Sequence, residues 1–171
     1  MSVHAESAAA VSAALAAADE LLDRAGPALD ARCAALAEAY ADADRALRCY
    51  EGLAASGVLR RRTRADRVDE EIVDRRILVT RTMSAQVTAW FALQAALAEA
   101  RTQAMRLIEA ACAANAAISR VPLEDERLVR IDLIAQGFAP TALRVRLQRA
   151  DGLVKSQIAG ADQDTQPIEA D

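Results

Sequence analysis

The stretch from Val58 to Val121 contains neither glycine nor proline over 64 residues, and its apolar residues recur in alternating steps of three and four. This spacing places them on one face of an α-helix, which repeats every 3.6 residues. A periodic run much longer than about 25 residues is typical of a coiled coil, a membrane span or a helical array. We therefore predict an all-α fold, an elongated helical bundle or coiled coil with one very long central helix over about residues 64–119.

The predicted long helix carries a seam of apolar residues that Arg76 and Gln86 interrupt upstream. Phe91 adjoins the seam, so more than one face of the helix is apolar and the helix should have more than one neighbour. The seam consists of Val79, Met83, Trp90, Leu93, Leu97, Ala100, Ala104, Leu107, Ala111, Ala114 and Ile118.

Glycine and proline divide the rest of the chain. Gly26-Pro27 pairs a helix-ending glycine with a proline that can open the next helix, and the residues from Gly137 to Pro140 form a second break. We expect residues 1–160 to form one domain with an N-terminal helical hairpin and two short C-terminal helices, and residues 161–171 to form a disordered acidic tail. The expected helices cover residues 5–25, 28–55, 123–136 and 141–158.

Alanine supplies about a quarter of the residues, whereas aromatic residues supply only 3%. Alanine has the highest helix propensity, but it offers little apolar area per residue. Burial must therefore come from many close contacts between helices, and a broad cavity lined by large side chains is not expected.

Charge is distributed unevenly along the chain. Residues 1–57 sum to −5, residues 58–82 to +3 and residues 161–171 to −4, which is compatible with acidic and basic helices that pair within or between subunits. Solvated helix faces without a specific partner are the favoured interpretation of the same charges. The three cysteines have unrelated spacings, no basic signal region opens the sequence, and no run of about 18 apolar residues is free of charge. We predict a cytoplasmic protein without a transmembrane segment.

No constellation of residues indicates catalysis. The sole histidine, His4, stands near the N-terminus, so catalytic triads, zinc sites and di-iron sites all lack their ligands or bases. Glycine-rich phosphate-binding motifs are also missing from the sequence. We expect no enzymatic activity, no cofactor and no bound metal.

At about 1.5 Å per residue the long helix extends beyond what the helices of about 20 and 28 residues can cover, so something else must bury the remainder. We therefore predict a non-enzymatic scaffold or adaptor, of the assembly-factor or chaperone type, that self-associates as a homo-oligomer or binds a protein partner along its long helix. The residues predicted to bind the partner are Val79, Met83, Trp90, Phe91 and Leu97.

Two alternatives remain open. Residues 128–154 superficially resemble a helix-turn-helix, in which Arg144, Arg146 and Arg149 would contact nucleic acid in a small DNA-binding regulator. We regard nucleic acid as the less favoured partner, because acidic residues precede this segment. The other alternative is an amphipathic coat on a hydrophobic particle or membrane surface. The basic cluster Arg60–Arg67 could meet an anionic partner, but neutralisation by the acidic residues that follow it, from Asp66 to Asp74, is the stronger interpretation.

Overall fold

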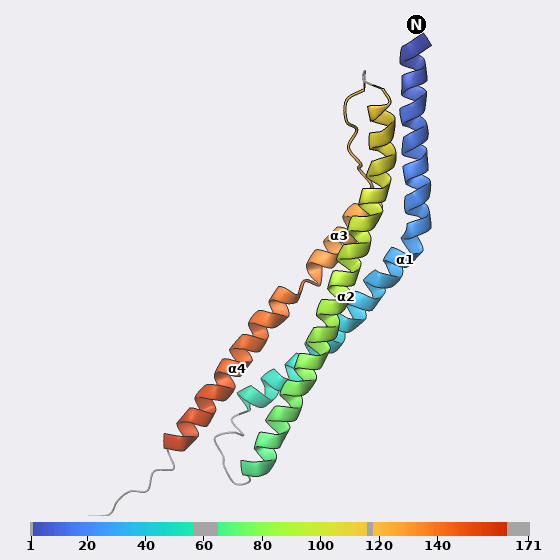
Figure 1. Cartoon of the computed structure of the whole chain (residues 1–171). Coiled ribbons are helices and arrows are strands. Elements are labelled where there is room, and N and C mark those ends of the chain that lie inside the picture. The colour runs from blue at the N-terminus through green and yellow to red at the C-terminus, as the bar shows by residue number, and fades with distance from the viewer. Residues whose placement is uncertain (1, 57–64, 116–117, 164–171) are drawn as a thin grey trace, which may run out of the picture. The chain divides into compact units, whose positions relative to one another are not determined.

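The structure is a computed structural model that describes residues 2–56, 65–115 and 118–163. All regular structure in these ranges is helical, which confirms the all-α class for the described part of the chain (Figure 1). The helices are α1 (Ser2–Ala55), α2 (Ala65–Ala113), α3 (Glu126–Gly137) and α4 (Pro140–Gln163).

The chain divides into two compact units, each described by itself below. The first unit contains Met1–Leu36 and Ala89–Phe138, and the second contains Ala37–Thr88 and Ala139–Asp171. Each unit therefore combines a segment of α1, a segment of α2 and one C-terminal helix. The single domain predicted for residues 1–160 stays a prediction.

The first unit has a core of leucine, isoleucine and alanine from α1, α2 and α3. On each helix the buried positions are spaced by three, four or seven residues, as expected for one apolar stripe per helix. Full burial of each leucine or isoleucine stabilises the unit by about 1.5–3 kcal/mol. The large buried residues are Leu22, Leu29, Leu36, Leu93, Leu97, Ile108, Leu128 and Ile131.

The second unit has a separate core, formed by α1, α2 and α4. Small residues of α1 contribute to it, which allows the helices to approach closely. The core contains Ala43, Ala46, Leu47, Tyr50, Ala54, Ile72, Val79, Met83, Leu143, Ala150 and Val154.

Pro27 lies inside α1, so the prediction that Gly26-Pro27 separates two helices is wrong. Proline in a helix interior removes one backbone hydrogen bond and costs about 3 kcal/mol. Its ring also crowds the Cβ of the preceding residue, but Gly26 has no Cβ. Leu22 and Leu29 are both buried, so the core face continues across the proline and offsets its cost. One helix therefore replaces the expected N-terminal hairpin.

The helix α2 ends at Ala113, six residues before the predicted end at residue 119. Beyond it, the Asn115 N–H donates to the Cys112 carbonyl at 3.1 Å, an i to i+3 bond that tightens the chain into a turn. Asparagine competes with helix by hydrogen bonding through its side chain. Here the Asn115 amide donates to the Ser7 hydroxyl of α1.

The C-terminal helices also differ from their predicted bounds. The helix α3 starts at Glu126, three residues later than expected, because Asp125 caps it. The helix α4 starts at Pro140, and proline is favoured at a first helical position because the backbone N–H that it lacks would have no partner within the helix. The helix continues to Gln163, five residues past its predicted end. The remainder of the predicted tail, residues 164–171, lies outside the described residues.

Candidate functional site

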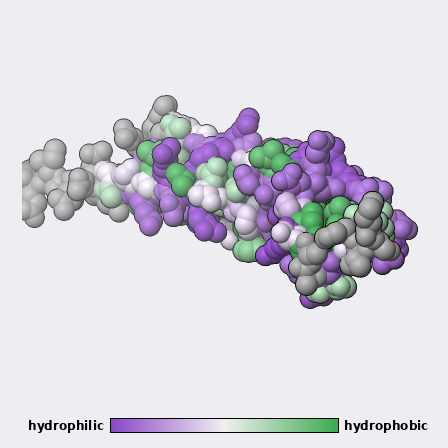
Figure 2. Space-filling model, turned by 90° about the horizontal axis from the view of Figure 1, so that it is seen from above, coloured by the Kyte–Doolittle hydropathy of each residue, from purple (hydrophilic) through white to green (hydrophobic). Residues whose placement is uncertain are grey.

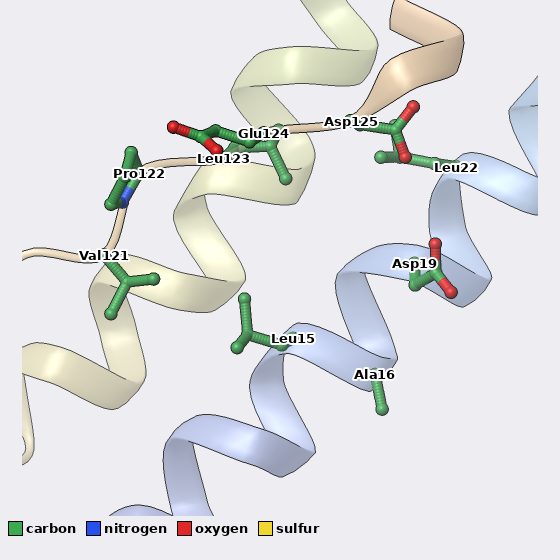
Figure 3. Close-up of a pocket in the computed structure, with 9 residues that line it drawn as sticks. All are labelled: Leu15, Ala16, Asp19, Leu22, Val121, Pro122, Leu123, Glu124 and Asp125. Atoms are coloured by element: carbon green, nitrogen blue, oxygen red, sulfur yellow. The ribbon is translucent and has the colours of Figure 1, made fainter.

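Three hollows of the first unit's surface meet at the segment Val121–Asp125, which leads into α3. One hollow, with a volume of about 580 Å³, lies between this segment and α1. In Figure 3, Leu15 of α1 and Val121 point toward the space from opposite sides. The segment is thus bordered by concave surface that apolar side chains help to line.

The largest of the three hollows, named here the α3 groove, has a volume of about 810 Å³. A third hollow of about 340 Å³ shares Leu123, Asp125 and Val129 with it. The α3 groove is lined by Leu123, Glu124, Asp125, Glu126, Val129, Arg130, Leu133 and Ile134.

Apolar side chains of α3 are exposed in the α3 groove. The helix buries Leu128 and Ile131 in the core. Val129, which follows Leu128, is rotated from it by about 100° around the helix axis. Val129 and Leu133 therefore share an outward face, one turn apart, and are 55% and 62% exposed. Figure 2 shows hydrophobic areas between hydrophilic ones on the face in view. Adjacent exposed apolar residues beside a hollow favour a binding surface.

The rim of the α3 groove is acidic. Glu124 and Glu126 are exposed, and within the described ranges neither forms an ion pair. Arg130, the basic lining residue, lies 3.7 Å from Asp30 of α1, which offsets its charge. The rim therefore attracts positive charge.

Asp125 fixes the start of α3. Its carboxylate accepts hydrogen bonds from the backbone N–H groups of Arg127 and Leu128, at 2.9 and 3.1 Å. This is the N-cap arrangement, which satisfies two N–H groups that the helix leaves without partners. The Arg127 side chain and these N–H bonds hold the pKa of Asp125 below its usual range.

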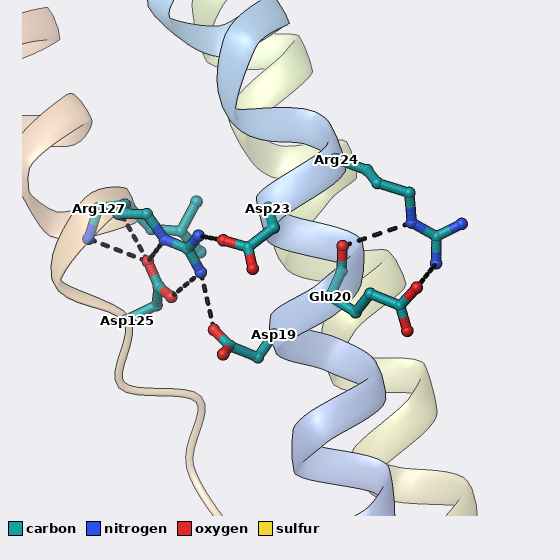
Figure 4. Close-up of polar contacts among 7 residues, drawn as sticks. Asp19, Glu20, Asp23, Arg24, Asp125 and Arg127 are labelled. Atoms are coloured by element: carbon teal, nitrogen blue, oxygen red, sulfur yellow. Dashed lines mark hydrogen bonds and ion pairs between the residues drawn. The ribbon is translucent and has the colours of Figure 1, made fainter.

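Arg127 joins the start of α3 to α1. Its guanidinium donates to Asp125 at 2.9 Å and to Asp19 of α1 at 2.8 Å, and it also pairs with Asp23 (Figure 4). Hydrogen bonds to Asp125 and then to Asp23 raise the pKa of Arg127. The cluster is partly exposed, so its main effect is to orient α3 on α1, since exposed ion pairs contribute little stability.

Trp90 and Phe91, both predicted to bind a partner, differ in their surroundings. The Trp90 indole N–H donates to the Ala135 carbonyl of α3 at 3.0 Å, and its ring packs against the core. Phe91 is 61% exposed and meets the Trp90 ring edge to face, at 5.1 Å between centroids. Phe91 is therefore the accessible member of the pair.

The other predicted partner-binding residues are buried. Val79 and Met83 lie in the second unit's core, and Leu97 lies in the first unit's core. From Val79 to Ala104 the α2 seam packs against α1 and a C-terminal helix of its own chain, whereas Leu107 and Ala114 near its end are exposed. Partner contacts through these three residues stay a prediction that requires the helices to open.

Of the three arginines predicted to contact nucleic acid, Arg146 is held within the second unit. It donates to Asp44 at 2.5 Å and to Glu51 at 2.7 Å, both on α1. The hydrogen bond from Arg146 keeps the pKa of Asp44 below its usual range. Arg144 and Arg149 are exposed.

Two further findings concern metal binding and membrane crossing by the described residues. Across residues 2–56, 65–115 and 118–163, no three His, Cys, Asp or Glu side chains gather where they could hold a metal ion. In the same ranges no helix has the length and apolar character that a membrane crossing requires. The side chains of His4 and of the basic cluster Arg60–Arg67 lie outside what is described.

The sequence did not identify the α3 groove, although its signals were present. Asp125 precedes a periodic run that continues through Leu128, Ile131 and Ala135, which is a helix start signal. Placing the helix start there leaves Val129 on the outer face. Contacts with α1 more than 100 positions away in sequence have no local signal.

Comparisons of the chain with protein-family models, with curated proteins and with solved structures find no match.

Proposed function

We propose that the protein is a non-enzymatic helical scaffold or adaptor of the cytoplasm that binds a protein partner in the α3 groove. The observation that carries the proposal is the exposure of Val129 and Leu133 beside a hollow of about 810 Å³. A groove of this kind suits an amphipathic helix, which inserts apolar residues spaced by three, four and seven positions.

Charge complementarity indicates which helix the α3 groove takes. Glu124 and Glu126 stand on the rim as exposed carboxylates. A partner helix with arginine or lysine beside its apolar face would place cations near these carboxylates and bind faster and more selectively. We therefore assign the groove to a basic amphipathic helix of another protein.

A pair of synthetic peptides tests this assignment. Both carry leucine at helical spacing, but one has arginine and the other glutamate at the flanking positions. Fluorescence anisotropy of labelled peptide measures binding to the full chain. We expect the arginine peptide to bind at least tenfold more tightly, and added salt to reduce the difference.

Substitutions in the groove complete the test. V129S with L133S should weaken binding of the arginine peptide about tenfold or more, because the apolar contacts are lost. L153S is the matched control, since Leu153 is an exposed leucine of α4 in the second unit. Equal binding by the groove variant and the control, or no binding of the arginine peptide at all, would refute the proposal.

DNA binding is the weaker proposal, because the charge of Arg146 is offset by Asp44 and Glu51. An electrophoretic shift assay with duplex DNA at low salt would test DNA binding. We do not propose the coat function, since no observation favours it.

A further inference from the structure

In the second unit, α2 has an outward face with exposed apolar side chains, in the green part of the helix in Figure 1. Ile77 and Leu78 are 53% and 43% exposed. They are consecutive, so they point to directions about 100° apart on the helix surface. The core face of the same segment, with Val79 and Met83, lies on the other side of the helix.

Two charged residues occupy the strip between Ile77 and Leu78. Asp74 and Arg81 are seven residues apart, so they are rotated by only about 20° from each other and lie about 10 Å apart along the axis. Both are exposed. Among the described residues, neither has an ion pair or a side-chain hydrogen bond. Their charges are thus available to another molecule.

The order of these four residues is self-complementary. Asp74 stands three positions before Ile77, and Arg81 stands three positions after Leu78. Consider a second copy of the helix lying antiparallel, with a twofold axis between Ile77 and Leu78. Asp74 of each copy then faces Arg81 of the other, and Ile77 and Leu78 each meet their own counterpart. This face of α2 is therefore complementary to the same face of a second copy, as the interface of a twofold dimer requires.

We infer that a second copy of this chain docks on this face of α2, forming an antiparallel pair with two reciprocal ion pairs between Asp74 and Arg81. The parallel arrangement in register is disfavoured, because it would place each charge beside its like. The interface uses none of the residues of the α3 groove, so it stands whether or not the groove binds a helix.

The area of contact sets the expected strength. About two turns from each copy form the pair, which places it in the class of small interfaces, below about 1,200 Å². Interfaces of that size are typical of weak, transient association. We expect dissociation constants in the micromolar range or weaker, and greater dissociation as salt screens the ion pairs.

Charge reversal distinguishes this geometry from other modes of association. Sedimentation of the full chain over a concentration series measures the dimer. D74R places two arginines opposite each other and R81D places two aspartates opposite each other, so each should weaken the dimer about tenfold or more. The double variant D74R/R81D exchanges the charges and should restore it.

A mixture of the single variants gives a second readout. D74R in one chain and R81D in the other re-create both ion pairs, so equal amounts of the two should form a heterodimer that neither forms alone. R106D, which reverses the exposed Arg106 of α2 in the first unit, should leave the dimer unchanged. Circular dichroism checks that each variant is helical.

The inference fails if the wild-type chain is monomeric throughout the concentration series. It also fails if a dimer forms but neither the double variant nor the mixture recovers it. Failure of the peptide experiment on the α3 groove would leave these outcomes unaffected, so the two proposals are separable.

Discussion

Arg76 of α2 binds Asp151 of α4 through two parallel contacts, from Nε to Oδ1 at 2.8 Å and from Nη2 to Oδ2 at 2.9 Å. Tyr50 of α1 donates its hydroxyl to the same carboxylate at 2.9 Å. These contacts join the three helices of the second unit beside its core. From the sequence, Arg76 is recognised only as an interruption of the apolar seam. In the structure its guanidinium pairs with the Asp151 carboxylate.

Replacement of Arg76 by leucine should lower the free energy of unfolding by about 1–3 kcal/mol, since a partly buried carboxylate loses its charged donor. Urea unfolding followed by circular dichroism measures the change. R75L is the matched control, because the one ion pair of Arg75 among the described residues is an exposed contact of 3.7 Å with Glu71. Its effect should stay within about 0.5 kcal/mol. Equal losses in the two variants would contradict the assigned role of Arg76.

Deprotonation of Tyr50 should destabilise the fold at high pH. Burial, and then the hydrogen bond to Asp151, raises the pKa of Tyr50 from 10.0 to about 12. Because the folded state favours the neutral phenol, this contribution is complete below pH 10 and is lost as the pH rises toward 12. Tyr40 is the other tyrosine, so absorbance titration of a Y40F variant isolates Tyr50. Titration near pH 10 in the folded variant would disprove the burial effect.

The Asp125 carboxylate should make stability depend on pH at the acid end. Its pKa is lowered in the folded state, so its contribution is complete above the ordinary value of 3.8 and is lost as the pH falls through the lowered pKa. D125N keeps a capping side chain but removes the charge that Arg127 binds. We expect D125N to lose about 1 kcal/mol at neutral pH and to show a smaller further loss in acid. Thermal unfolding over pH 3–7 measures both, and parallel pH curves would exclude this role.

Replacement of Pro27 by alanine should raise the free energy of unfolding by about 1–3 kcal/mol, because it restores a helix hydrogen bond and removes a ring that crowds the backbone. In that background, G26A should add up to about 1 kcal/mol. Space is available, since a Cβ at Gly26 would meet no atom within 4 Å apart from its chain neighbours and the adjacent helix backbone. With Pro27 present, G26A should gain less, because the ring crowds the new Cβ. Chemical denaturation compares the three variants, and a destabilised P27A would show that the proline has another role.

The apolar seam shows how far sequence periodicity reaches. It correctly located buried residues at Val79, Leu97 and Ala104, but it continued to Leu107, which is partly exposed, whereas Ile108 is buried. A straight helix drifts by about 20° per heptad relative to a strict seven-residue repeat. Over the four heptads from Val79 the drift approaches the 100° that separates adjacent residues, so the buried position shifts by one residue, from Leu107 to Ile108.

Other features depend on contacts that no local pattern encodes. Gly26-Pro27 is a strong break signal, yet core packing on both sides keeps α1 continuous. Arg127 and Asp19 are 108 positions apart, and their pairing requires α3 to be placed on α1. The candidate groove depends on that placement, so sequence alone predicts the helices but not the surface that they create.

Neither compact unit is contiguous in the sequence, because α1 and α2 each supply a segment to both. A terminal truncation that extends into the core therefore removes part of one unit and leaves the remainder of that unit covalently attached to the other. Dissecting the two units would require rejoining distant segments, such as residues 1–36 with 89–138, through a new linker.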